Sequence, residues 1–151
     1  MFFLYTIFAI KFILIRFFHN KFLTLNEDAL PLWLEKIAHA EDYKIDKMDY
    51  NFIDAKDLLK LNERHLDHHT DTDIITFDYS EGKTVLAEAF ISTDALNENA
   101  SKFYQSIENE SLRLIVHALL HCVGYNDKTD QDKKVMREKE SFYIDLFHVK
   151  Q

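Results

Sequence analysis

The segment LRLIVHALLHCVG, residues 112–124, constrains the fold of this 151-residue chain more than any other. In a helix its aliphatic side chains point in nearly every direction, so the helix has to be buried inside a domain. His117 and His121 interrupt the apolar pattern four residues apart, which places both imidazoles on one face. Buried polar groups without partners cost about 1–3 kcal/mol each, so both rings need partners. We therefore expect a central helix that carries a buried histidine pair.

A divalent metal ion is one partner that satisfies both rings. Gly124, one of only two glycines, can adopt the left-handed conformation that ends a helix, and Asp127 follows it three residues later. Two histidines from a helix and a third ligand from the next turn form a metzincin-like arrangement, and three protein ligands leave a fourth position open. The spacing predicts a metal site at His117, His121 and Asp127. The alternative is a pair of core histidines bonded to the backbone, with Asp127 as a turn residue.

The residues around the first histidine bear on the chemistry. Zinc proteases of the H-E-x-x-H type carry a glutamate general base directly after that histidine, whereas this chain has Ala118. Another group then has to accept the proton, or the metal alone lowers the pKa of its water toward about 7. Arg113, one turn earlier on the same face, is a candidate phosphate ligand. Its alternative role is a surface cation paired with Glu108 or Glu110.

The rest of the chain alternates between strand and helix patterns. Strand patterns cover residues 11–18, 47–54 and a hairpin over 72–93 that turns near Gly82, and helix patterns cover 25–41, 55–66, 94–105, 112–123 and 131–147. The order predicts an α+β fold, a single domain with a small mixed sheet of about four strands packed with about five helices. In the last helix we expect residues 133–140 to form a solvated face. Phe142, Tyr143, Leu146 and Phe147 are expected in the core.

Composition limits the compartment and the partners. The single cysteine, Cys122, excludes an intramolecular disulfide and indicates a reducing compartment, which we take to be the cytoplasm. The net charge of −8 argues against a broad electrostatic grip on nucleic acid, though not against a small metal-centred RNA site. Residues 1–13 are apolar, but the run before Lys11 is too short to span a bilayer. We assign residues 1–13 to a hydrophobic extension of uncertain role and 14–151 to the domain, and expect no stable membrane association.

Three motifs in order resemble the YbeY family of metal-dependent rRNA-maturation endoribonucleases. The family's helix H-G-x-L-H-L-x-G-Y-[DN]-H corresponds to HALLHCVGYND at 117–127, with aspartate in place of the last histidine. The stretch LNERHLDHHTDTDIITF at 61–77 is similar to a second motif, with identical residues at Leu61, Asn62, Thr72, Asp73 and Phe77. The strand AEAFIST at 87–93 resembles the family's G-D-I-x-I-S, with Glu88 for the aspartate.

The resemblance implies a single-strand-specific endoribonuclease that matures the 3′ end of 16S rRNA and takes part in small-subunit quality control. It also implies one Zn²⁺ per chain, with rRNA and the small ribosomal subunit as partners. An aspartate ligand broadens the choice of divalent metal. The family often has an arginine where this chain has Leu66, and Arg64, two positions away, is a second candidate for phosphate binding.

Two other functions stay open at this point. One is a non-catalytic ribosome-assembly factor with a structural metal, which Leu66 and the acidic net charge favour. The other is a metalloprotease-like hydrolase, which Ala118 disfavours.

Overall fold

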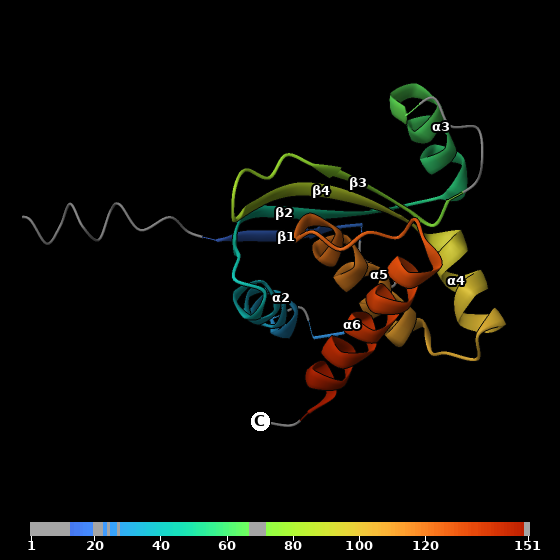
Figure 1. Ribbon diagram of the computed structural model, residues 1–151. Coiled ribbons are helices and arrows are strands. Elements are labelled where there is room, and N and C mark those ends of the chain that lie inside the picture. The colour runs from blue at the N-terminus through green and yellow to red at the C-terminus, as the bar shows by residue number, and fades with distance from the viewer. Residues whose placement is uncertain (1–12, 20–22, 24, 27, 67–71, 150–151) are drawn as a thin grey trace, which may run out of the picture.

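The computed structural model of the chain describes residues 13–19, 23, 25–26, 28–66 and 72–149, so positions 1–12 of the expected N-terminal extension lie outside the described residues. Figure 1 shows the elements in chain order: β1 (Leu14–Phe18), α2 (Ala29–Ala40), β2 (Lys44–Ile53), α3 (Ala55–Leu66), β3 (Ile74–Asp78), β4 (Thr84–Ser92), α4 (Thr93–Lys102), α5 (Ile107–Cys122) and α6 (Asp130–His148). Within these ranges no helix combines the length and the apolar character needed to cross a bilayer.

The strands form one mixed sheet in the order β1-β2-β4-β3. β2 pairs in parallel with β1 on one side and with β4 on the other, whereas β3 and β4 are antiparallel. Gly82 lies in the connection between β3 and β4 with a φ of 56°, as the predicted hairpin requires. The described part of the chain thus contains four strands and five helices, which confirms the predicted α+β class.

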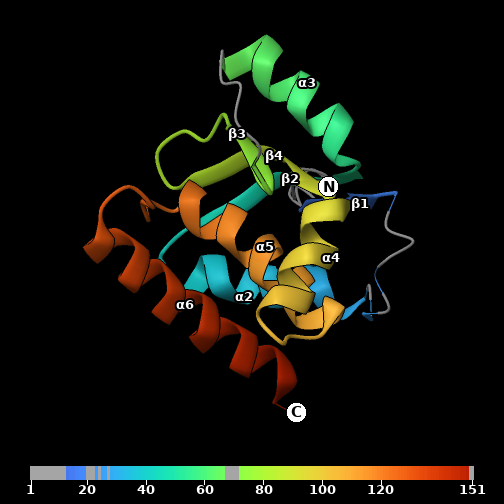
Figure 2. The ribbon, with the colours of Figure 1, turned by 90° about the vertical axis from the view of Figure 1, so that its right-hand side faces the viewer.

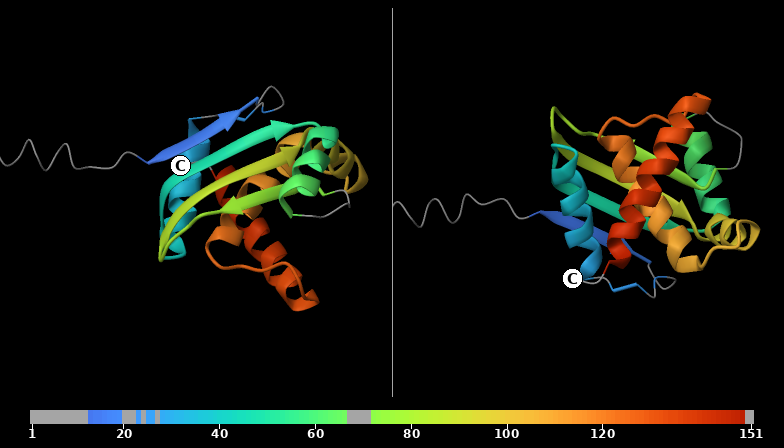
Figure 3. Two further views of the ribbon diagram at one scale, coloured as in Figure 1. Left: turned by 90° about the horizontal axis from the view of Figure 1, so that it is seen from above. Right: turned by 60° about the horizontal axis from the view of Figure 1, so that its bottom comes forward.

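α2, α5 and α6 form two layers on one face of the sheet (Figure 1). α5 lies directly against β3 and β4, α2 packs on β2, and α6 packs across α5 as an outer layer (Figures 2 and 3). α3 sits at one end of the sheet on the opposite side (Figure 1). From residue 112 onward the aliphatic side chains of α5 are fully buried, which confirms the predicted central helix: Leu112, Leu114, Ile115, Val116, Ala118, Leu119 and Leu120. Tyr50 in β2 fixes this helix further, because its hydroxyl donates to the Ile115 carbonyl at 2.8 Å.

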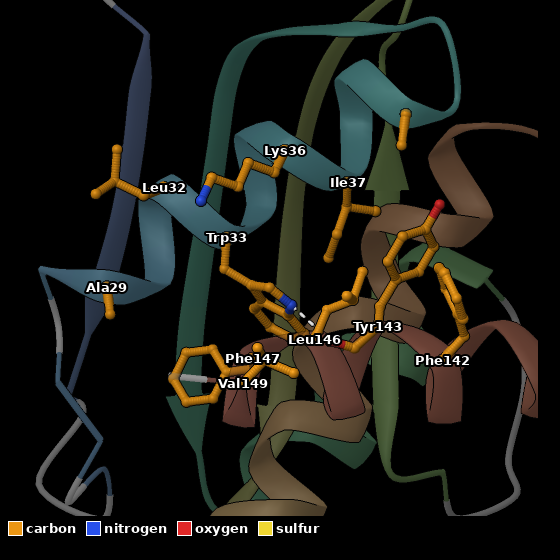
Figure 4. A pocket seen from close by; sticks show the side chains of 11 residues that line it. Ala29, Leu32, Trp33, Lys36, Ile37, Phe142, Tyr143, Leu146, Phe147 and Val149 are labelled. Atoms are coloured by element: carbon orange, nitrogen blue, oxygen red, sulfur yellow. Dashed lines mark hydrogen bonds between the residues drawn. The ribbon is translucent and has the colours of Figure 1, made fainter. Parts of the chain in front are cut away.

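An apolar groove of about 490 Å³ lies between α2 and α6 (Figure 4). Tyr143 is buried beside it, and its carbonyl accepts a 2.7 Å hydrogen bond from Nε1 of Trp33. Phe142 and Leu146 are 56% and 47% exposed on the groove, so the expectation that they belong to the core is wrong. The physical reason is that α6 is an outer helix. α6 buries only the side chains that face α5. Its apolar residues also occur outside that face, and those side chains are exposed.

Candidate metal centre

Four polar side chains of α5 share one face of the helix by their spacing: Glu110, Arg113, His117 and His121. The His117 side chain is 17% exposed, and His121 in the last turn is exposed. Both histidines lie on one face, as predicted, but the expectation that both are buried is wrong for His121. The last turn of α5 reaches the edge of the core, where a polar side chain contacts solvent without cost.

The turn after α5 brings Asp127 back to the helix. Gly124 has a φ of 104°, the positive value expected of a residue that ends a helix. The backbone N–H of Tyr125 then donates to the Leu120 carbonyl at 3.0 Å and reverses the chain. Asp127, which is about half exposed, places Oδ2 at 3.9 Å from Nε2 of His117. The structure therefore places two of the predicted ligands together.

The third predicted ligand is not part of a closed set. Among the described residues, no three His, Cys, Asp or Glu side chains form a group that could hold a metal ion. His121 lies one helical turn beyond His117 on the same face, and it is exposed. The α5 backbone thus places His121 on the face that carries His117. The His121 side chain does not form a three-residue group with His117 and Asp127 in this structure.

Glu140 in α6 orients the His117 ring. Nδ1 of His117 lies 2.7 Å from Oε2 of Glu140, which is only 3% exposed; because an ionised carboxylate can only accept, Nδ1 is the donor in this contact. With the proton on Nδ1, the lone pair of Nε2 is free on the side where Asp127 lies. A carboxylate that fixes the tautomer in this way is the usual outer-shell partner of a metal-binding histidine.

Sequence patterns missed Glu140, because residues 133–140 were expected to form a solvated face. The signal was present in the spacing. Met136 and Tyr143, four residues before and three after, are apolar and buried on the same side of α6. A glutamate between two such positions faces the core.

Arg113 lies one helical turn before His117 in α5 and contacts three carboxylates. Its guanidinium donates to Glu110 through Nη2 at 2.7 Å and through Nε at 3.0 Å, and Nη2 also donates to Asp73 at 3.4 Å. Nη1 of Arg113 lies 3.8 Å from Oε1 of Glu140. Burial acts against the cation, but the hydrogen bonds to Glu110 and the charges of Glu110, Glu140 and Asp73 outweigh it and raise the pKa of Arg113. The pairing with Glu110 agrees with the alternative role, except that the pair is partly buried and not a surface contact.

The second phosphate candidate lies apart from this cluster. Arg64 is exposed in the last turn of α3, and α3 packs against β3, β4 and α4. Leu66 ends the same helix, but its side chain lies outside the described residues. Asp73, which the second motif supplied by sequence, does reach the site through Arg113.

Two neighbours of the histidines point into the core. Ala118 is fully buried, so a side chain at this position cannot reach a substrate above the histidine face. Cys122 is 6% exposed, and burial together with the nearby Asp78 raises the pKa of its thiol to about 12. A thiol in this state is a packing group and a poor metal ligand.

Two of the three candidate donors, His117 and Asp127, have close to the spacing of two ligands on one divalent cation. Ligand atoms about 2.1 Å from a tetrahedral zinc lie roughly 3.4 Å apart. The 3.9 Å between Nε2 of His117 and Oδ2 of Asp127 is close to this spacing. One imidazole with a fixed tautomer, one carboxylate and an adjacent exposed imidazole are borderline ligands that suit zinc or a similar ion.

Comparison with known proteins identifies the family. The family model described as endoribonuclease YbeY matches residues 15–148 of this chain. The chain belongs to the YbeY family. The endoribonuclease YbeY of Flavobacterium johnsoniae is 38% identical over 134 residues, which cover 89% of this chain and 96% of that protein. The YbeY protein of Cytophaga hutchinsonii is 42% identical over 115 residues, covering 76% of this chain and 80% of the relative.

A solved structure agrees with the YbeY fold found here. The solution structure of a Thermotoga maritima protein superposes with a TM-score of 0.60 at 24% identity, over 89% of each chain. The match to the family model and the identities with the curated relatives confirm the family that the three sequence motifs indicated.

Proposed function

We propose that this chain is a metal-dependent endoribonuclease that cleaves single-stranded RNA during rRNA maturation, with the metal held by His117, His121 and Asp127. Membership of a family whose relatives are named endoribonucleases supports the reaction class. The single observation that supports the site is the orientation of His117, whose Nδ1–H is held by Glu140 while Nε2 faces Asp127.

The roles of the side chains follow from their positions. His117, His121 and Asp127 would hold the ion at this face, where it would supply a Lewis acid for phosphodiester hydrolysis. Glu140 keeps the proton of His117 on Nδ1 and so keeps Nε2 available as a ligand. Arg113 balances the buried charges of Glu110 and Glu140. His121 and Asp127 are exposed, which leaves the site accessible to a long polymer.

The exposure of the ligands also bears on the assembly-factor alternative. A structural zinc has four protein ligands in a closed shell, whereas a catalytic zinc has an open position. Here two of the three candidate ligands, His121 and Asp127, are exposed, and none of the three belongs to the hydrophobic core cluster. This arrangement favours a catalytic ion. The proposed substrate is rRNA of the small ribosomal subunit, and zinc is the proposed ion.

The test uses a single-stranded RNA fragment from the 3′ end of small-subunit rRNA. Wild-type protein should cleave it, cleavage should stop when a chelator is added, and added zinc should restore it. His117→Ala should be inactive but folded, because the core does not include this ring. His39→Ala is the matched control, since His39 is exposed on α2 away from α5. Cleavage that survives both the chelator and His117→Ala would overturn the proposal.

A further inference from the structure

The turn that carries Asp127 is tied to a distant part of the fold. Tyr125, two residues before Asp127, extends its side chain to α2, where its hydroxyl donates to Oε1 of Glu41. Glu41 caps the C-terminal end of α2 and is separated from Tyr125 by 84 positions in the chain. Two groups of α6 share the same carboxylate. The Tyr143 hydroxyl donates to Oε2 at 2.5 Å, and Nζ of Lys139 donates to Oε2 at 3.3 Å.

This carboxylate is well suited to hold three donors. The Glu41 side chain is 11% exposed, so little solvent competes for its oxygens. Burial acts to raise the pKa of Glu41, but the donors Tyr125, Tyr143 and Lys139 outweigh it and lower the pKa, so the group is ionised at neutral pH. Hydrogen bonds to an ionised acceptor are about twice as strong as neutral ones. Lys139 also lies 5.5 Å from the ring centre of Tyr125, which adds a cation–π contact.

The backbone transmits this anchor to Asp127. Tyr125 is fixed at both ends, because its N–H also donates to the Leu120 carbonyl. On the other side of Asp127, Thr129 begins α6 with a capping box, in which Thr129 and Asp132 exchange two hydrogen bonds. Asp127 is therefore the middle residue of a three-residue span between two fixed points. A span this short leaves Asp127 little freedom once Tyr125 and Thr129 are set.

We propose that Glu41 is a positioning residue for the metal centre, and that it fixes Asp127 beside His117 by holding Tyr125. This inference rests on the proposed function, because it assigns Asp127 as a ligand. The side-chain partners of Glu41 are Tyr125, Lys139 and Tyr143, so Glu41 acts on Asp127 through the turn that carries Tyr125. Tyr143 and Lys139 hold the Glu41 carboxylate in place. The same carboxylate therefore joins α2 to α6 and fixes the turn of the metal centre.

The test measures zinc affinity by competition with a chromophoric chelator. Tyr125→Phe and Glu41→Gln should each weaken zinc binding by about tenfold, the lower end of the range for outer-shell partners. Tyr104→Phe is the matched control, since Tyr104 is 95% exposed, and its affinity should equal that of the wild type.

A double-mutant cycle separates positioning from a general loss of structure. Asp127→Ala removes the ligand, so adding Tyr125→Phe to it should cause no further loss of zinc affinity, although unfolding by urea should still show the stability cost of the lost hydroxyl. Wild-type affinity in Tyr125→Phe and Glu41→Gln would overturn the inference, and so would an equal further loss in the Asp127→Ala background. If the wild type binds no zinc, the proposed function itself fails; if it binds zinc but the cycle shows no coupling, only the positioning role fails.

Discussion

Replacement of Arg113 by methionine tests whether this arginine is a structural cation or a phosphate ligand. Its guanidinium is the cation that lies between Glu110 and Glu140, which are 2% and 3% exposed. Methionine keeps much of the side-chain volume and removes the charge. Loss of one partner from a buried ion pair costs about 3–5 kcal/mol, because the other charge stays buried without compensation. The Arg113 side chain is itself 26% exposed, so we expect the lower end, a loss of about 3 kcal/mol in the free energy of unfolding.

The assay is unfolding by urea, monitored by circular dichroism. The slope of the free energy of unfolding against urea concentration should be the same in the variant and the wild type. Arg137→Met is the matched control, since Arg137 is exposed on α6 and lines the same surface pocket, between α5 and α6, as Arg113. It should change the stability by less than about 0.5 kcal/mol. Adding Glu110→Gln to Arg113→Met should recover part of the loss, because one of the two buried charges is then removed.

The opposite result would refute this role. Arg113 contacts phosphate if two results occur together. Arg113→Met is as stable as the wild type, and its RNA binding is weaker, with a slope of log affinity against log salt concentration that is shallower by about one. Arg64→Met gives the comparison for the second candidate, which is exposed on α3.

Three more outcomes follow from individual residues. Cys122, with a thiol pKa raised to about 12 by burial, should react with a thiol reagent at pH 8 only as fast as the protein unfolds; rapid labelling of the native protein would contradict its placement. Glu41 has a pKa lowered from its ordinary value of 4.5, so its carboxylate stabilises the fold above that pH and this contribution is lost as the pH falls through the folded pKa. The stability gap between wild type and Glu41→Gln should therefore be widest near neutral pH and close on acidification below about 4.5 in an unfolding series, and a constant gap would argue against it. Gly124→Ala should lose about 1–2 kcal/mol through its positive φ and also weaken zinc binding, whereas Gly82→Ala should show a comparable loss of stability with unchanged zinc affinity.

Local patterns predicted the elements because each depends on neighbours in the chain. The period of α5, the hairpin at Gly82 and the turn at Gly124 need no information from distant residues, and the structure has all three. The proximity of His117 and Asp127 also follows from local geometry, since one helical turn and one reversal separate them.

The surroundings of the site could not be predicted in this way. Glu140 meets His117 across 23 positions, and Tyr125 meets Glu41 across 84, so each contact exists only once α6 and α2 are packed. A charged side chain in a mixed helix is usually solvated, and only its partner shows why it is buried. The exposure of His121 could not be predicted for the same reason. How far the end of a helix is buried depends on which distant elements pack over it.

The most direct measurement of the metal site is X-ray absorption at the zinc edge of the zinc-loaded protein, compared with His121→Ala. The wild type should bind one zinc per chain, with two imidazole nitrogens at about 2.0–2.1 Å and a carboxylate oxygen at about 2.0–2.2 Å. The His121→Ala spectrum should lack one imidazole. Sulfur at about 2.3 Å, or identical spectra for the two proteins, would contradict the assignment of His117, His121 and Asp127 as the ligands.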